Sequence, residues 1–208
     1  MKLEGVKVLD LSVFLPGPAV SLMMADHGAE VIKIEAMGQG DPLRKWRKLH
    51  EGTSLWWYLQ SRNKKSLALD LKSAEGLDLV KQLLGDADVL VQNLAPGAAA
   101  RMGLSFEALH ERFPRLIVCD ISGYGEGGPY EKKKAYDLLI QSEGGFLSVT
   151  GGPGEDQMAK AGCSIADISA GMYAYSGILS ALLLRGKTGL GSRVDVSMLE
   201  SLVEGMGD

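Results

Sequence analysis

Short apolar runs alternate along the chain with longer segments in which apolar and polar residues are mixed. The runs are four to seven residues long and are bounded by polar residues, glycine or proline. This pattern is typical of strands that are buried on both faces. The expected strands are residues 6–11, 31–35, 67–71, 89–94, 116–122 and 193–196.

The segments between these runs carry helix signals. Pro18 is well placed as the first residue of a helix that runs to about Asp26. Ser73 and Ser105 are expected to be N-caps, because a hydroxyl oxygen accepts hydrogen bonds from the free N–H groups of a first helical turn. Further helices are expected at 97–101, from about 136 in YDLLIQSEGGFLSV, from near 167 to 186, and from 198 onwards.

This alternation predicts an α/β fold with a mainly parallel sheet covered by helices on both faces. No tandem repeat and no long linker divides the sequence, so residues 1–208 are expected to form one domain. Ligands of such sheets bind beyond the carboxyl ends of the strands. We therefore expect the functional residues to follow strands directly.

Composition narrows the classes of function. The chain has 208 residues, of which 46% are hydrophobic and 23% are charged, as in a soluble globular protein. A formal charge of −4 provides no positive field for nucleic-acid binding. Glycine accounts for 27 of the 208 residues, about twice the usual share of roughly 7%. Most of these glycines are expected at turns or at close backbone approaches.

The cysteines and the N-terminal sequence indicate a cytoplasmic location. Cys119 and Cys163 each lie in an apolar segment without a CxxC partner, and the start MKLEGVKVLDLS lacks the layout of a signal peptide. The longest uncharged run, residues 168–184, contains glycines, serines and tyrosines. We expect it to form a buried helix rather than a membrane span.

Several common motifs are absent from the sequence. The first strand is followed by FLPGPA rather than GxGxxG, and there is no GxxxxGK[ST] phosphate loop. The three histidines lack metal-ligand spacing, and no serine lies in a GxSxG turn. We therefore expect neither a metal site nor serine-hydrolase chemistry.

Five segments together resemble one family over essentially the whole chain. They are LPGPAVSLMMADHGAEVIKIE, RNKKSLALDLKSAEGLDL, VQNLAPGAAARMGL, ISGYGEGGPYEKKKAYDLLIQSEGG and SIADISAGMYAYSGILSALLLRGKTGLGSRVDVSMLES. The family is that of the class III coenzyme A transferases, which includes formyl-CoA transferase, carnitine CoA-transferase and 2-methylacyl-CoA racemases. The resemblance implies a Rossmann-like large domain, a small domain beyond the end of this chain, and homodimers built as linked rings. It implies acyl-CoA and a small carboxylic acid as substrates, and no permanently bound cofactor.

The resemblance implies that Asp167 is the covalent nucleophile. Residues 167–172 match the family pattern D-x-x-x-G-M, in which the aspartate takes the acyl group as a mixed anhydride and then carries CoA as a thioester. The start of a helix is expected to keep such a carboxylate ionised. A simpler interpretation makes Asp167 the N-cap of its helix, and the two roles are compatible.

Positions matched to the family also imply a set of CoA contacts. Cationic side chains suit the phosphates of CoA, and a flat apolar surface suits its adenine. The alternative for the run Lys132, Lys133 and Lys134 is a set of solvated charges. The implied contacts are Leu15, Lys72, Asn93, Arg101, Met102, Lys134 and Asp137.

Departures from the family pattern concern the substrate. Leu15 stands where the oxalate-pathway enzymes have a glutamine, which argues against a formyl or oxalate substrate, and Ala36 replaces an arginine that contacts CoA. Trp46, Trp57 and Tyr58 are candidates for an acyl pocket or for the core and interfaces.

Two alternatives to CoA transfer stay open. In the racemases the position of Asp137 holds a catalytic aspartate preceded by histidine, but here Tyr136 precedes it. Epimerisation also needs two opposed acid/base groups, and no second one is identifiable. The other alternative is a non-catalytic CoA-binding fragment, since the family's subunits continue past the end of this chain.

Overall fold

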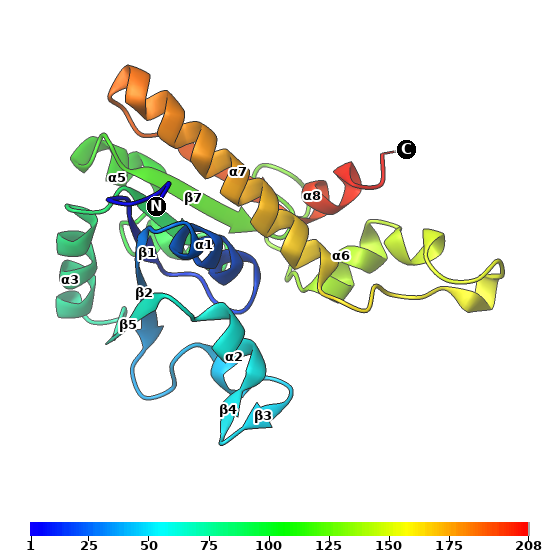
Figure 1. Cartoon of the computed structure of the whole chain (residues 1–208). Coiled ribbons are helices and arrows are strands. Elements are labelled where there is room, and N and C mark those ends of the chain that lie inside the picture. Colours follow the sequence, from blue (N-terminus) through cyan, green and yellow to red (C-terminus); the bar gives the residue numbers. More distant parts are fainter. Residues whose placement is uncertain (208) are drawn as a thin grey trace.

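The computed structural model describes residues 1–207 and contains a six-stranded sheet (Figure 1). All neighbouring strands in this sheet are parallel, in the order β5-β2-β1-β6-β7-β8. The predicted α/β fold is therefore confirmed. The strands are β1 (Lys7–Asp10), β2 (Glu30–Ala36), β5 (Lys64–Leu69), β6 (Val89–Gln92), β7 (Ile117–Ser122) and β8 (Arg193–Ser197).

The strand order places a crevice in the middle of the sheet. Counted along the chain within this sheet, the order is third, second, first, fourth, fifth, sixth, so the direction of winding reverses between β1 and β6. In such sheets the loops after the two central strands leave in opposite directions and open a ligand crevice at their carboxyl ends. The loops that begin at residues 11 and 93 are the ones concerned.

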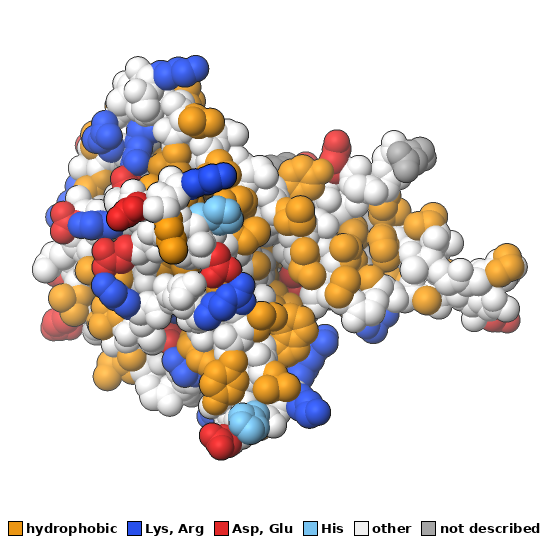
Figure 2. Space-filling model, in the orientation of Figure 1, with side chains coloured by type: hydrophobic (Ala, Val, Ile, Leu, Met, Phe, Trp, Pro, Cys, Tyr) orange, Lys and Arg blue, Asp and Glu red, His pale blue; other side chains and the backbone are white. Residues whose placement is uncertain are grey.

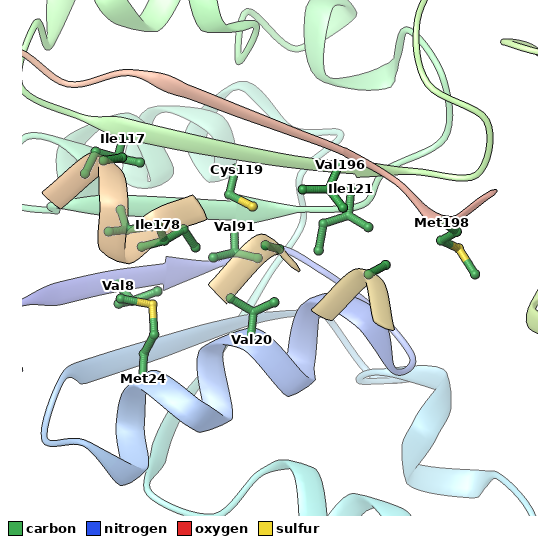
Figure 3. Packing of buried hydrophobic residues seen from close by; sticks show 14 of the residues in the cluster. Val8, Val20, Met24, Val91, Ile117, Cys119, Ile121, Ile178, Val196 and Met198 are labelled. Carbon is green, nitrogen blue, oxygen red and sulfur yellow. The ribbon is translucent and has the colours of Figure 1, made fainter. Parts of the chain in front are cut away.

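Helices cover the two faces of the sheet. The first face is covered by α1 (Pro16–Asp26) and α7 (Ile165–Thr188), and the second by α3 (Ala74–Leu84) and α5 (Phe106–Arg112). Figure 3 shows the core of the first face, in which Val20 and Met24 of α1 and Ile178 of α7 point toward the strands. The strand residues there include Val91 and Cys119, which are fully buried. Burial on both faces explains why β6 and β7 are apolar throughout.

Helix α7 packs closely on α1 through small residues. A Cβ atom on Gly171 would lie 3.1 Å from the Pro16 carbonyl oxygen, so only glycine allows this approach without a shift. The buried side of α7 also includes Ala170 and Ala174.

The prediction that α7 is a buried helix was wrong for much of its surface. Met172, Tyr173 and Leu183 on α7 are exposed, and 28% of its most apolar 18-residue window is buried. By length and composition alone this helix could cross a membrane. Its buried side packs on the sheet and α1, and its exposed side forms part of the apolar surface in Figure 2.

Several predicted boundaries shift in the structure. Helix α1 begins at Pro16, two residues before Pro18, because prolines fit anywhere in a first turn. Strand β5 spans Lys64–Leu69 instead of 67–71, because it begins with the polar residues Lys64, Lys65 and Ser66 and therefore lacks an apolar signal there. Ser73 and Ser105 are N-caps as predicted, each accepting a hydrogen bond from the first turn of its helix.

Shorter elements lie outside the sheet (Figure 1). Gly145, with φ of 78°, ends the helix expected from 136, so α6 stops at Glu143. Of the two free cysteines, Cys119 is buried and Cys163 is exposed. The remaining elements are η1 (Pro42–Lys45), β3 (Leu49–His50), β4 (Thr53–Ser54), α2 (Leu55–Gln60), α4 (Ala98–Arg101), α6 (Asp137–Glu143), η2 (Phe146–Val149), η3 (Glu155–Gln157) and α8 (Met198–Glu204).

Candidate functional site

The predicted site residues lie in segments that follow the carboxyl ends of the parallel strands. Asp167 is in the first turn of α7, which leads from the end of β7 back to the start of β8. The other residues come after strand ends, namely Leu15 after β1, Lys72 after β5, Asn93, Arg101 and Met102 after β6, and Lys134 and Asp137 after β7.

Asn93 joins the two loops at the central crevice. Its Oδ1 accepts a hydrogen bond from the Val13 N–H at 2.8 Å, and its Nδ2 donates to the Val13 carbonyl at 2.9 Å. Both polar ends of the amide are therefore occupied in holding the loop after β1. Contact between Asn93 and CoA stays a prediction.

Leu15 lies in a small apolar cluster below the same loop. It is buried with Leu43 and Trp57, and Trp46 and Trp56 pack against these three residues. Trp57 is therefore a core residue. Tyr58, by contrast, is exposed.

The three cations predicted to bind CoA lie on the surface. Lys72, Arg101 and Lys134 are all exposed. Within residues 1–207, none of these three side chains forms an ion pair. Met102 is half-buried against the core of the second face.

Asp137 and Asp167 are brought into contact. The Asp137 Oδ1 accepts a hydrogen bond from the Ala166 N–H at 2.8 Å and from the Asp167 N–H at 3.4 Å. Ser164 occupies the N-cap position of α7 but makes no side-chain cap bond. Asp137 therefore caps α7 from another helix, and Asp167 is the third residue of α7. The interpretation of Asp167 as the N-cap was wrong.

The electrostatic surroundings of Asp167 differ from the sequence-based expectation. Burial raises the pKa of Asp167 to about 7, and the negative charge of Asp137 adds to the rise. The start of the helix was expected to keep Asp167 ionised, but Asp137 already accepts the N–H groups that would do so. Desolvation and a like charge both disfavour the ionised form.

A buried charge cluster, missed by the sequence analysis, lies beside the loop after β1. Lys33 on β2 and Lys64 on β5 each have side chains only 2% exposed. The Lys33 Nζ lies 3.7 Å from the Asp10 Oδ1 and 3.2 Å from the Asp41 Oδ2. The Lys64 Nζ lies 3.5 Å from the Asp10 Oδ2, and burial lowers the pKa of Lys64 to about 8. Two positive charges thus face two negative ones, which buried charges require.

This cluster holds the loop that enters α1. Lys33 donates a hydrogen bond to the Ser12 carbonyl, and the Asp41 Oδ1 accepts one from the Phe14 N–H at 3.3 Å. Phe14 has φ of 62°, a left-handed backbone that residues other than glycine rarely adopt. A lysine inside the apolar run VIKIE was the available signal for this cluster.

A hollow opens at the carboxyl ends of β2 and β5, with Ala36 in its wall. Glu35 accepts two hydrogen bonds from Arg44, at 2.6 and 2.8 Å. Burial raises the pKa of Glu35, but bonds from Arg44 and Ser66 outweigh it and bring this pKa to about 2. The hollow is thus lined on one side by a neutralised ion pair.

No metal centre is found in the described part of the chain, where no group of three or more His, Cys, Asp and Glu residues is arranged to hold an ion. The chemistry available at this edge of the sheet is that of two neighbouring carboxylates, one of them at the start of a long helix, together with exposed cations. A carboxylate whose pKa is raised is a good candidate for nucleophilic or acid–base chemistry.

Comparison with known proteins gives a consistent result. The model of the family described as "CoA-transferase family III" matches residues 3–208. Human succinyl-CoA:glutarate CoA-transferase is 40% identical over 202 residues, covering 97% of this chain and 46% of that protein. Formyl-CoA:oxalate CoA-transferase of Escherichia coli is 40% identical over 202 residues, covering 97% of this chain and 48% of that protein.

A solved structure shares the whole described fold. A CAIB/BAIF family protein from Brucella suis superposes with a TM-score of 0.91 at 36% identity, covering 97% of this chain and 54% of that one. The chain spans about half the length of the curated relatives it matches.

Proposed function

This chain belongs to CoA-transferase family III, and from that membership we propose that it carries the reacting carboxylate of an acyl-CoA:carboxylate CoA-transferase. Asp167 is the nucleophile. The observation that carries this proposal is the half-buried carboxylate of Asp167 in the first turn of α7, with the Asp137 carboxylate beside it.

The reaction proceeds through two kinds of covalent intermediate. The Asp167 carboxylate attacks the thioester carbon of the donor, the C–S bond breaks, and CoA leaves as a thiolate. The thiolate then attacks the aspartyl carbon of the mixed anhydride, which releases the donor acid and leaves CoA on Asp167. The acceptor carboxylate attacks this thioester and expels the thiolate again. Attack of the thiolate on the acceptor carbon gives the new acyl-CoA and restores Asp167.

The surroundings of Asp167 support such a role. Its pKa of about 7 makes it a stronger nucleophile, when ionised, than an ordinary aspartate. Acylation removes one of two neighbouring negative charges, so the repulsion from Asp137 is relieved in the covalent intermediates. Asp137 therefore favours the step in which Asp167 becomes bonded to the acyl group or to CoA.

CoA is bound as a substrate at the carboxyl edge of the sheet, with no permanently bound cofactor and no metal. Lys72, Arg101 and Lys134 are exposed cations, suited to its phosphates. Asn93 and Met102, which both follow β6 in the chain, complete the proposed set of contacts. Leu15 makes the region near the acyl group apolar, which argues against a formyl or oxalate substrate.

Epimerisation through Asp137 is less well supported. A base must have an oxygen free to take the proton, but three N–H donors already occupy the Asp137 oxygens.

We further propose that this chain is the large-domain part of the protein, which continues into a small domain and acts as a homodimer of linked subunits in the cytoplasm. The apolar surface over α6 and α7 supports an assembly (Figure 2). It includes exposed Leu138, Leu139, Met172, Tyr173 and Leu183. Neither nucleic acid nor a membrane is part of the proposed function.

Chemical trapping tests the proposal. The full-length protein is incubated with succinyl-CoA or formyl-CoA, each with glutarate or oxalate as acceptor, and is then treated with hydroxylamine. Mass spectrometry should find a hydroxamate on Asp167, and the succinyl-CoA reactions should give more of it. The Asp167→Asn variant is the control.

Three results would overturn the assignment. New acyl-CoA formed without any adduct on Asp167 excludes this nucleophile. Exchange of the α-proton of a branched acyl-CoA with solvent, without CoA transfer, favours the racemase. Binding of CoA without either reaction identifies a non-catalytic protein.

A further inference from the structure

Gln141 is a fully buried polar residue that the reaction scheme does not use. It lies on α6, one turn after Asp137, and its side chain is 0% exposed. Its Nε2 donates a hydrogen bond to the Asp137 Oδ2 at 2.6 Å, and its Oε1 accepts one from the Ala161 N–H at 2.9 Å. Every polar atom of a buried amide needs such partners, and here they lie on two different segments.

The partner on one side fixes the orientation of the amide. A backbone N–H can only donate, so the atom of Gln141 that faces Ala161 is the oxygen. The NH₂ group therefore faces Asp137, and it can only donate. Asp137 is thus surrounded by donors, with Gln141 on one oxygen and the N–H groups of Ala166 and Asp167 on the other.

The same amide also holds the chain that leads into α7. Ala161 precedes the helix by four residues, and Ser164 provides no side-chain cap. One buried side chain therefore fixes both the cap of α7 and the segment from which α7 begins. Asp167 lies in the turn that is held in this way.

We propose that Gln141 is a positioning residue for Asp167, acting by locking the Asp137 carboxylate against the first turn of α7. This inference rests on the proposed function for its effect on catalysis. It assigns Gln141 no contact with substrate.

Other charged groups near this turn have different partners or face solvent. Asp137 is the charged side chain that influences Asp167 in the described part of the chain. On the neighbouring segments, Lys133 pairs with Glu143, Lys134 is exposed, and the Lys160 Nζ donates to the Ala161 carbonyl. Loss of the hydrogen bond from Gln141 to Asp137 should therefore affect Asp167 mainly through Asp137.

The first test replaces Gln141 by methionine in the full-length protein. Without the Gln141 donor, the Asp137 carboxylate is no longer held against the first turn of α7 and moves away from Asp167, which reduces the negative charge beside Asp167. The ¹³C carboxyl signal of Asp167, identified by its loss in Asp167→Asn, should then titrate at a pH lower by about one. We expect kcat to fall about tenfold or more, with a smaller change in KM for acyl-CoA.

A second variant tests the hydrogen bond between residue 141 and Asp137 if methionine disturbs the fold. In Gln141→Glu a protonated carboxyl group can still donate to Asp137 and still accept from Ala161. This variant should approach wild-type kcat at low pH and lose it as pH rises and the carboxyl group ionises. Ser142→Ala is the matched control, since Ser142 is the next residue of α6 and its hydroxyl donates to the Leu138 carbonyl of the same helix.

The outcomes separate this inference from the proposed function. An unchanged Asp167 titration and unchanged kcat in Gln141→Met, or a pH profile of Gln141→Glu that matches wild type, overturn the positioning role. A shifted titration in a protein that forms no adduct on Asp167 supports the positioning role and overturns the proposed function.

Discussion

Among single residues, Asp137 and Asp167 at the start of α7 have different roles. Asp137 takes the N–H groups at the start of α7, which an aspartate in the first turn would otherwise share. Asp167 is left in a partly desolvated position beside a negative charge, and its pKa rises to about 7. The Asp137 carboxylate therefore caps the helix, and the Asp167 carboxylate has a raised pKa.

This division predicts how stability depends on pH. The pKa of Asp167 is raised above its unfolded value of about 3.8, so its contribution to stability is present below that value and is lost as pH rises through about 7. Asp167→Asn should therefore increase the free energy of unfolding at pH 8 by roughly 2 kcal/mol. The gain should fade toward pH 4.

Urea unfolding of the full-length protein at both pH values measures this effect. Asp78→Asn, at an exposed position on α3, is the control. A stabilisation by Asp167→Asn that is equal at pH 4 and pH 8 would contradict the electrostatic account.

At the scale of elements, the position of α7 depends on its contact with α1. Gly171 lies one turn after Asp167, against the Pro16 carbonyl, in the first turn of α1. The loop before α1 is held in turn by Asn93 and by the buried Lys33 cluster. Asp167, the proposed nucleophile, is therefore positioned by two helices and by the loop at the central crevice.

A pair of glycine substitutions on α7 tests this contact. Gly171→Ala forces α7 away from α1 and should cost about 1–3 kcal/mol of stability while also lowering kcat. Gly186→Ala lies on the same helix with open space around the new methyl group. It should increase stability by roughly 0.5–1 kcal/mol, since alanine favours a helix over glycine. Equal effects on kcat would show that the α1–α7 contact does not position Asp167.

Local patterns predicted much of the fold. The apolar runs indicated that β6 and β7 are buried on both faces, and Ser73 and Ser105 indicated where two helices begin. These features could be predicted because each depends only on residues that are neighbours in the sequence. The cap of α7 by Asp137 could not be predicted, since it joins residues 29 positions apart.

The burial of Lys33 was missed for the same reason. Its partner Asp41 lies on another segment and is brought close only by the fold. The sequence run itself shows one charge among apolar residues, with no sign of what neutralises it.

In the whole molecule, Asp167 and the exposed cations Lys72, Arg101 and Lys134 lie in segments that follow the carboxyl ends of the strands. Lys72 follows β5 on one side of the central crevice, and Arg101 and Lys134 follow β6 and β7 on the other side. The chain spans about half the length of its curated relatives, so the complete protein is the proper subject of the tests.

Isotope transfer follows the oxygen atoms of Asp167 through the proposed reaction. If the acceptor acid attacks CoA-bound Asp167, the bridging oxygen of the new anhydride comes from the acceptor and stays on Asp167 when the thiolate attacks the acceptor carbon. Turnover of the full-length protein with an ¹⁸O-labelled carboxylate acceptor should therefore leave ¹⁸O in the peptide that contains Asp167. Product formation with ¹⁸O absent from Asp167 would contradict the account.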